Sequence, residues 1–285
     1  MSTVIERNHV NIIGTGTKVI MLAHGFGCDQ STWKFITHAF LKEYKLVLFD
    51  YVGSGKSDLT EYDYHKYATL EGYACDVLDI IHELELNDVI FIGHSVSGMI
   101  GMLAAIQEPR LFNKLIFIGP SPKYINSHEY FGGFEKDQVE QLFKFMAEDY
   151  VGWSRHLAPQ VMQNEENPQF TEFLQESFES MDPKIALAFA KATFNCDHRD
   201  QLKELKVPSV SLMATNDFVS SKTVGDYIKR YTPYNSLHMM NATGHYPQIS
   251  APEETIAAIK SFIQTDFNPR LSQRKTAKQS SQFSD

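Results

Sequence analysis

The sequence predicts an α/β fold: a mostly parallel central sheet flanked by helices, with a four-helix cap inserted into it. Short apolar, β-rich runs alternate with amphipathic helical stretches along most of the 285 residues. Two of these runs, IFIG and LIFIG, are continuously apolar, which is typical of parallel strands buried on both faces. A block of helix-like segments interrupts the alternation and predicts the cap. The length suffices for one such core with a substantial insertion.

The apolar runs define the strands, and the amphipathic stretches between and after them define the helices of the core. The predicted strands are Val19–Ala23, Leu46–Asp50, Val89–Gly93, Lys114–Gly119, Pro208–Ala214 and Ser236–Asn241, with an earlier edge strand at Val10–Ile13. The predicted core helices are Gln30–Phe40, Leu70–Leu84, Val96–Gln107, Lys222–Tyr231 and Pro252–Thr265.

No strand is predicted between Ser121 and Asp200. Pro168 and Pro183 in this block fit the first turn of a helix, where proline is well tolerated. Ligands of open α/β sheets bind at the carboxyl ends of the strands, so a cap above those ends would enclose a pocket. The predicted cap helices are Glu135–Val151, Gly152–Met162, Pro168–Met181 and Pro183–Asn195.

The predicted organisation is an α/β core in two parts, residues 1–120 and 200–267, separated by the cap of residues 121–199. Residues 268–285 are polar and nearly free of apolar side chains. Such a segment cannot bury enough surface to offset the entropy of ordering, so a disordered tail is predicted. Its basic residues leave a docking role open, although a solvated extension is the simpler interpretation.

Composition excludes several classes of function. Hydrophobic residues make up 43% and charged residues 21%, as in ordinary soluble proteins, and the net charge is −9. A negatively charged chain of this kind is not expected to bind nucleic acid or anionic membrane surfaces. No apolar stretch approaches the roughly 20 residues of a membrane span, and the amino terminus does not resemble a signal peptide.

The three cysteines, Cys28, Cys75 and Cys196, are far apart and odd in number, with no C-x-x-C motif. This pattern favours three reduced thiols in a cytoplasmic protein over a disulfide framework or a zinc site. No metal-ligand cluster such as H-E-x-x-H occurs, and no organic cofactor is implied.

The segment VIFIGHSVSG, residues 89–98, predicts a nucleophile elbow, in which a strand turns sharply into a helix at a serine. The backbone at that serine is strained, so its neighbours two positions away must be small. Gly93 meets this requirement, and Ser97 occupies the position of the second glycine in G-x-S-x-G. Ser95 is therefore the candidate nucleophile. An ordinary helix N-cap serine is the alternative, and the flanking strand and helix argue against it.

A serine needs a base to remove its proton, and in α/β-hydrolases the chain order is Ser, then Asp or Glu, then His. Asp217 follows the strand 208–214, and His245 lies in the loop after the strand 236–241. The competing acid position after the strand 114–119 reads Pro-Ser-Pro and has no carboxylate. The predicted catalytic triad is Ser95, Asp217 and His245, with the aspartate holding the histidine tautomer.

An oxyanion hole requires two N–H groups aimed at the developing negative charge. Val96, just after the nucleophile, and Phe26, just after a His24-Gly25 turn, are the predicted donors. His24 and His94 are predicted to brace the site by hydrogen bonds rather than to take part in proton transfer.

Several longer strings resemble the subgroup of α/β-hydrolases that contains bacterial RsbQ and the plant karrikin and strigolactone receptor hydrolases. These strings are HGFGCDQ at 24–30, FDYVGSG at 49–55 and GHSVS at 93–97. GPSP at 119–122, GGF at 132–134, GW at 152–153 and DHR at 197–199 extend the likeness through the cap. The resemblance covers roughly Asn8 to Phe262. His24 and Ser97 look more like the plant receptors than like RsbQ.

The resemblance implies a V-shaped cap above a closed, largely apolar pocket. Matched by position, the pocket should be lined by Phe26, Phe134, Trp153, Leu157 and Phe194. A signalling role is also implied, because RsbQ acts with a PP2C-type phosphatase in the general stress response. The plant relatives hydrolyse butenolide ligands slowly and transmit the event to protein partners.

The predicted function is that of a cytoplasmic serine hydrolase acting on small apolar ester- or lactone-like molecules, operating as a ligand sensor. One alternative is a plain metabolic carboxylesterase without a protein partner, and another is a binding protein with a vestigial triad. The turnover rate distinguishes the ligand sensor from the plain carboxylesterase, because kcat of a catabolic enzyme should approach about 1–1,000 per second and that of a receptor should be far lower. Dehalogenase or epoxide-hydrolase chemistry needs an aspartate at the elbow, and Ser95 excludes it.

Overall fold

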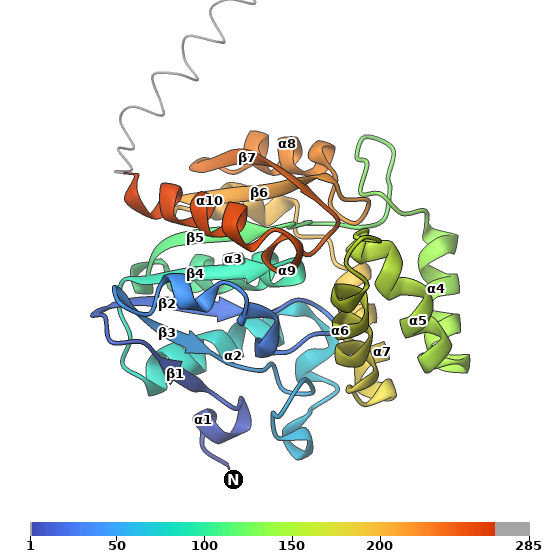
Figure 1. Cartoon of the computed structure of the whole chain (residues 1–285), viewed down its shortest axis with the longest axis horizontal. Helices are drawn as coiled ribbons and strands as arrows, with labels where there is room; N and C mark the ends of the chain where they lie inside the picture. The colour runs from blue at the N-terminus through green and yellow to red at the C-terminus, as the bar shows by residue number, and fades with distance from the viewer. Residues whose placement is uncertain (1, 266–285) are drawn as a thin grey trace, which may run out of the picture.

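A seven-stranded sheet organises the computed structural model of the chain, which describes residues 2–265 (Figure 1). The strand order is β1-β3-β2-β4-β5-β6-β7, and every neighbouring pair is parallel except β1 with β3. The predicted α/β-hydrolase fold is thereby confirmed. The strands are β1 Asn11–Ile13, β2 Lys18–Ala23, β3 Tyr44–Leu48, β4 Val89–His94, β5 Phe112–Ile118, β6 Ser209–Asn216 and β7 Asn235–Thr243.

Helices cover both faces of the sheet because side chains alternate along each strand. In β2, Val19, Met21 and Ala23 join the apolar cluster that packs against α2, α3 and α8. Ile20 and Leu22 join the cluster on the opposite face, under α10, which crosses the sheet in Figure 1. The α-helices are α1 Val4–Arg7, α2 Leu70–Glu83, α3 Val96–Gln107, α4 Lys136–Glu148, α5 Tyr150–Met162, α6 Pro168–Glu179, α7 Pro183–Phe194, α8 Lys222–Tyr231, α9 Pro247–Ser250 and α10 Pro252–Gln264.

The predicted helix Gln30–Phe40 is wrong. The structure has two short 3₁₀ turns there, η1 Gln30–Trp33 and η2 Thr37–Ala39. Trp33, Ile36 and Phe40 are buried in the core, and their spacing of three and four residues imitates the pattern of an amphipathic α-helix. The segment is rich in aromatic and β-branched residues, which are weaker helix formers.

The third strand begins two residues before the predicted Leu46–Asp50 and ends at Leu48. Asp50 has left the strand ladder because its carboxylate accepts hydrogen bonds from the backbone N–H groups of Gln30, at 2.9 Å, and Lys56, at 2.9 Å. Two further short helices, α1 and α9, are not predicted from the sequence. The remaining strands and helices lie within a few residues of their predicted bounds.

The four predicted cap helices are present as α4–α7, and no strand lies between β5 and β6 in the described part of the chain. Figure 1 shows these helices grouped at one end of the sheet, the end toward which the arrows of β2 and β3 point. Pro168 and Pro183 stand at the starts of α6 and α7, as predicted. The division into residues 1–120, 121–199 and 200–267 stays a prediction, and the tail predicted at 268–285 lies outside the described residues.

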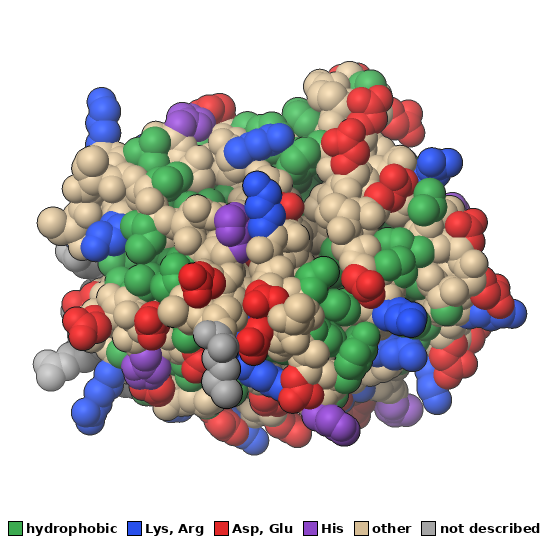
Figure 2. All heavy atoms as spheres, turned by 90° about the horizontal axis from the view of Figure 1, so that it is seen from below, with side chains coloured by type: hydrophobic (Ala, Val, Ile, Leu, Met, Phe, Trp, Pro, Cys, Tyr) green, Lys and Arg blue, Asp and Glu red, His purple; other side chains and the backbone are tan. Residues whose placement is uncertain are grey.

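Charged side chains of both signs are interspersed on the surface seen from below in Figure 2. This face therefore presents no broad field of one sign. None of the helices within residues 2–265 is both long enough and apolar enough to span a membrane.

Candidate active site

The nucleophile elbow is visible in the backbone of Ser95, which joins β4 to α3. Its φ of 56° is in the left-handed region, which side chains other than glycine rarely adopt. A Cβ on Gly93 would lie 2.4 Å from the carbonyl oxygen of Ser97, so only glycine fits that position. The structure therefore shows the strained turn that the sequence predicts at Ser95.

Ser97 replaces the second glycine of the motif without disturbing the turn. Its buried hydroxyl donates a hydrogen bond to the carbonyl oxygen of His24 and accepts one from the phenol of Tyr51, at 2.9 Å. The serine thus ties the loop after β2 to the start of α3. We attribute the tolerance of serine at this position to these two hydrogen bonds, since a buried hydroxyl without partners would be unfavourable.

The structure brings together the three predicted triad residues from the ends of three strands. Ser95 Oγ lies 2.8 Å from Nε2 of His245, and Nδ1 of His245 lies 2.7 Å from Oδ2 of Asp217. All three residues are buried. The arrangement has the geometry of a nucleophile, a base and a group that orients the base.

Hydrogen bonds to Asp217 determine which nitrogen of His245 carries the proton. Oδ1 of Asp217 accepts from the backbone N–H groups of Val219, at 2.8 Å, and Ser220, at 3.1 Å. Oδ2 therefore remains as the acceptor for Nδ1–H of His245. With the proton on Nδ1, the lone pair of Nε2 points at the Ser95 hydroxyl, as a general base requires.

The two predicted oxyanion-hole donors flank this triad. Among residues 2–265, no group accepts a hydrogen bond from the backbone N–H of Phe26 or of Val96. Gly25 lets the loop after β2 lie close to His94, because a Cβ at this position would lie 2.5 Å from Nδ1 of His94. Two unengaged donors beside a nucleophile can stabilise an oxyanion, and their role stays a prediction.

His24 and His94 hold neighbouring loops in place, which confirms the predicted bracing. His24 accepts a hydrogen bond from the backbone N–H of Tyr51, at 3.2 Å, and donates to the carbonyl of Gly25, at 2.9 Å. His94 donates to the carbonyl of His245, at 2.8 Å. Burial lowers the pKa of His24, and burial together with the nearby His245 lowers the pKa of His94 well below its ordinary value. Both rings are therefore neutral.

A small cavity, here called the inner cavity, adjoins Ser95 and His245 and has a volume of about 40 Å³. Four predicted pocket residues line it: Phe26, Phe134, Leu157 and Phe194. Sequence reasoning missed the other lining residues, which come from separate loops and cap helices and carry no motif. They are Tyr124, Leu142, Val161, Phe178, Thr193, Phe218, Val219 and Tyr246.

Trp153, the remaining predicted pocket residue, does not line the inner cavity. It lines a larger outer cavity of about 420 Å³ between α4 and α5. Its buried ring stacks on Tyr150, with ring centroids 5.2 Å apart, and meets Phe26 edge to face at 6.0 Å. The shared lining of the two cavities consists of Phe134, Leu142, Leu157, Phe194 and Phe218.

Phe194 at the end of α7 forms the centre of this shared wall. Its ring lies edge to face with Phe26, at 6.2 Å, and with Phe134, at 5.7 Å, and is tilted against Tyr124, at 5.0 Å. The side chain thus contacts the core, the loop before the cap and the cap itself. It therefore lines both the inner and the outer cavity.

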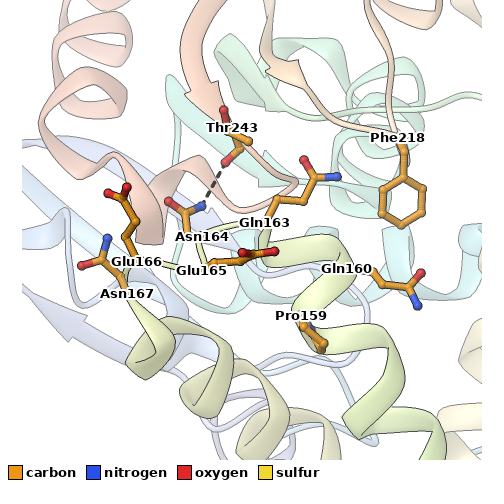
Figure 3. A pocket seen from close by; sticks show the side chains of 9 residues that line it. All are labelled: Pro159, Gln160, Gln163, Asn164, Glu165, Glu166, Asn167, Phe218 and Thr243. Atoms are coloured by element: carbon orange, nitrogen blue, oxygen red, sulfur yellow. Dashed lines mark hydrogen bonds between the residues drawn. The ribbon is translucent and has the colours of Figure 1, made fainter.

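A third, open cleft of about 900 Å³ lies beside the end of α5 (Figure 3). In the figure, Asn164 donates a hydrogen bond to the carbonyl of Thr243, at 3.3 Å, which ties the cap to the end of β7. The lining is mostly polar and includes neither triad residues nor oxyanion-hole donors. We therefore assign the chemistry to the inner cavity.

The described residues 2–265 contain no group of three or more His, Cys, Asp or Glu side chains that could hold a metal ion. The three cysteines are unpaired.

Known proteins resemble this chain over most of its length. The model of the alpha/beta hydrolase family matches residues 20–258. A probable esterase of rice (Oryza sativa subsp. japonica) is 38% identical over 93% of this chain and 99% of its own length. A karrikin insensitive 2 receptor of Petunia hybrida is 36% identical over 93% of this chain and 99% of its own length. A solved hydrolase from Oleispira antarctica superposes with a TM-score of 0.90 at 38% identity, covering 92% of this chain and 97% of that one.

Proposed function

Because the chain belongs to the alpha/beta hydrolase family, we propose that it is a serine hydrolase that cleaves small apolar esters or lactones. The acyl-enzyme would form on Ser95. The observation that carries the proposal is the continuous hydrogen-bonded chain from Asp217 through His245 to Ser95, beside the inner cavity. Esterase and hydrolase names among the relatives support the same class of reaction.

In the proposed reaction, Nε2 of His245 takes the hydroxyl proton as Oγ of Ser95 attacks the carbonyl carbon. The backbone N–H groups of Phe26 and Val96 stabilise the negative oxygen of the tetrahedral intermediate. Collapse of this intermediate breaks the bond to the leaving oxygen, which receives the proton from His245. Water then repeats the sequence on the acyl-enzyme and releases the acid.

The direct test is the intact mass of the protein after incubation with a library of small esters and lactones. We expect a mass increase equal to one acyl group, located on the peptide that contains Ser95. A protein that binds these compounds without either an adduct or turnover would instead be a receptor with a vestigial triad.

Acyl-chain length is expected to limit turnover. The inner cavity has room for only a few heavy atoms, and aromatic rings close it. The kcat/KM for the acetyl and butyryl p-nitrophenyl esters should therefore exceed that for the palmitoyl ester by at least about 100-fold. A single misfitting methylene group can already produce a difference of this size. Phe194→Ala should reduce this preference, because it opens the wall between the cavities.

The control for the wall variant is Phe131→Ala, since the Phe131 side chain is 54% exposed and lines neither cavity. Equal kcat/KM for all chain lengths in the wild-type protein would contradict an enclosed acyl site.

A ligand-sensing role extends the proposal, and the relative named as a karrikin insensitive 2 receptor supports it. In this form, occupancy of the site governs the docking of a protein partner on the cap. A PP2C-type phosphatase as the partner, a general stress response and a cytoplasmic location belong to the same proposal. Ligand and partner can be coupled only if the ligand binds the docking-competent cap more tightly than the alternative arrangement. A tenfold coupling needs about 1.4 kcal/mol of differential binding.

The sensing role predicts ligand-dependent capture of one protein. Purified wild-type protein is treated with a sulfonyl fluoride that modifies active serines, freed of excess reagent, and used as bait in native lysate. Ser95→Ala cannot be modified and serves as the matched control. We expect one partner to be enriched by modified wild type alone, and kcat for small esters to lie far below about 1 per second. Identical capture by all baits, together with a kcat in the usual enzyme range, would contradict the sensing role and support the alternative, a plain carboxylesterase without a protein partner.

A further inference from the structure

Thr193 lines the inner cavity and carries a hydroxyl that the proposed reaction does not use. Thr193 is 2% exposed and lies in the last turn of α7, next to Phe194. Its Oγ1 is fully buried and has no hydrogen-bond partner among the described residues. Two other polar groups of the lining are paired: Ser95 with His245, and the Tyr246 phenol, which accepts a hydrogen bond from the Cys28 thiol at 3.8 Å. Tyr124 also has an unpartnered hydroxyl.

An unpartnered buried hydroxyl is destabilising by about 1–3 kcal/mol, so each case calls for an explanation. A helical threonine usually avoids this by bonding to a carbonyl one turn earlier, and Thr193 makes no such bond. Valine has nearly the same shape and would fill the same space without the unsatisfied oxygen. Stability alone therefore does not account for threonine at this position.

The position of Thr193 indicates which part of a substrate could meet its hydroxyl. Thr193 lines the inner cavity, together with Ser95, and is absent from the lining of the outer cavity. A cavity of about 40 Å³ holds only two or three waters or a few acyl atoms. An acyl group attached to Ser95 would therefore contact the walls on all sides, whereas a bulkier leaving group fits the outer cavity of about 420 Å³.

We infer that the Thr193 hydroxyl is a hydrogen-bonding subsite for a second oxygen on the acyl part of the substrate, close to the scissile carbonyl. The inference rests on the proposed hydrolase function and narrows its substrates to esters or lactones of short, oxygen-bearing acids. An ether, hydroxyl or keto oxygen would satisfy Thr193 and would gain more from it than a methylene group does.

Two p-nitrophenyl esters test this subsite, the methoxyacetate and the butyrate. Their acyl groups have the same length, and an ether oxygen in one replaces a methylene in the other. The quantity measured is the ratio of kcat/KM for the methoxyacetate to that for the butyrate, compared between variants so that intrinsic ester reactivity cancels. In Thr193→Val, we expect this ratio to fall about tenfold. The melting temperature should stay equal or rise.

Thr193→Ser retains the hydroxyl and should keep the wild-type ratio. Thr255→Val is the matched control: Thr255 is also buried and helical, but its hydroxyl is paired with the carbonyl of Ala251 at 3.0 Å. That variant should lose stability without changing the ratio. A wild-type ratio in Thr193→Val, or an equal loss for both esters, would overturn the subsite while leaving the hydrolase proposal intact. If the wild-type protein cleaves neither ester, the hydrolase proposal itself fails, and the subsite with it.

Discussion

Replacing Ser95 with alanine is expected to lower kcat for p-nitrophenyl acetate to the residual rate that binding and the oxyanion hole supply. The substitution removes the hydroxyl oxygen that lies 2.8 Å from Nε2 of His245, so no acyl-enzyme can form. The N–H groups of Phe26 and Val96 remain, and a residual rate about 10³–10⁴-fold above the reaction in water should persist. Steady-state kinetics and the loss of the acyl adduct from the intact mass measure the effect.

Ser261→Ala is the control for this variant, because Ser261 is exposed on α10, away from both cavities. It should turn over p-nitrophenyl acetate at the wild-type rate. Ser95→Ala should also melt no lower than the wild-type protein, since alanine retains the backbone turn and the Cβ of the elbow. Wild-type turnover by Ser95→Ala would reject the proposed mechanism.

Asp217→Asn is expected to lower kcat by about 10⁴-fold while KM changes little. The two backbone N–H groups of Val219 and Ser220 will take the amide oxygen as their acceptor. The amide NH₂ then faces Nδ1 of His245, which must become an acceptor and carry its proton on Nε2 instead. In this tautomer the ring cannot accept the proton of Ser95, although all heavy atoms remain in place.

The matched control is Asp226→Asn, which removes the charge from an exposed aspartate paired with Lys222 on α8. Its turnover should equal that of the wild-type protein. A similar small loss in both variants would show that charge alone, and not the histidine tautomer, determines the effect of Asp217. An Asp217→Asn variant with nearly full activity would remove Asp217 from the triad.

Local sequence patterns predict most of the fold because the relevant forces act between near neighbours in the chain. The helices Val96–Gln107 and Lys222–Tyr231 have the predicted bounds. The first begins at the strained serine and the second presents a clear apolar face, so neither depends on distant contacts for its limits. The predicted helix Gln30–Phe40 is wrong for the opposite reason. Its apolar spacing fits both an α-helix and a pair of 3₁₀ turns, and burial of Trp33, Ile36 and Phe40 under the sheet decided between them.

The candidate triad was also predictable, since each member follows directly from a strand. Parallel strands place their carboxyl ends at one edge of the sheet, and so Ser95, Asp217 and His245 are brought together although they are far apart in sequence. The inner cavity was only partly predictable. Trp153 stands in the outer cavity instead, and Thr193 and Phe178 carry no local signal that separates a cavity wall from ordinary packing.

The sequence by itself therefore determined the order of strands and helices, the elbow at Ser95 and the loops that carry its two partners. These features depend on apolar periodicity and on residues that a particular backbone conformation requires, both of which are local. The tertiary structure alone decided the tautomer of His245, the division into inner and outer cavities and the unpaired hydroxyl of Thr193. Each of these depends on which side chains from distant segments of the chain come into contact. The packing of the cap against the core determines those contacts.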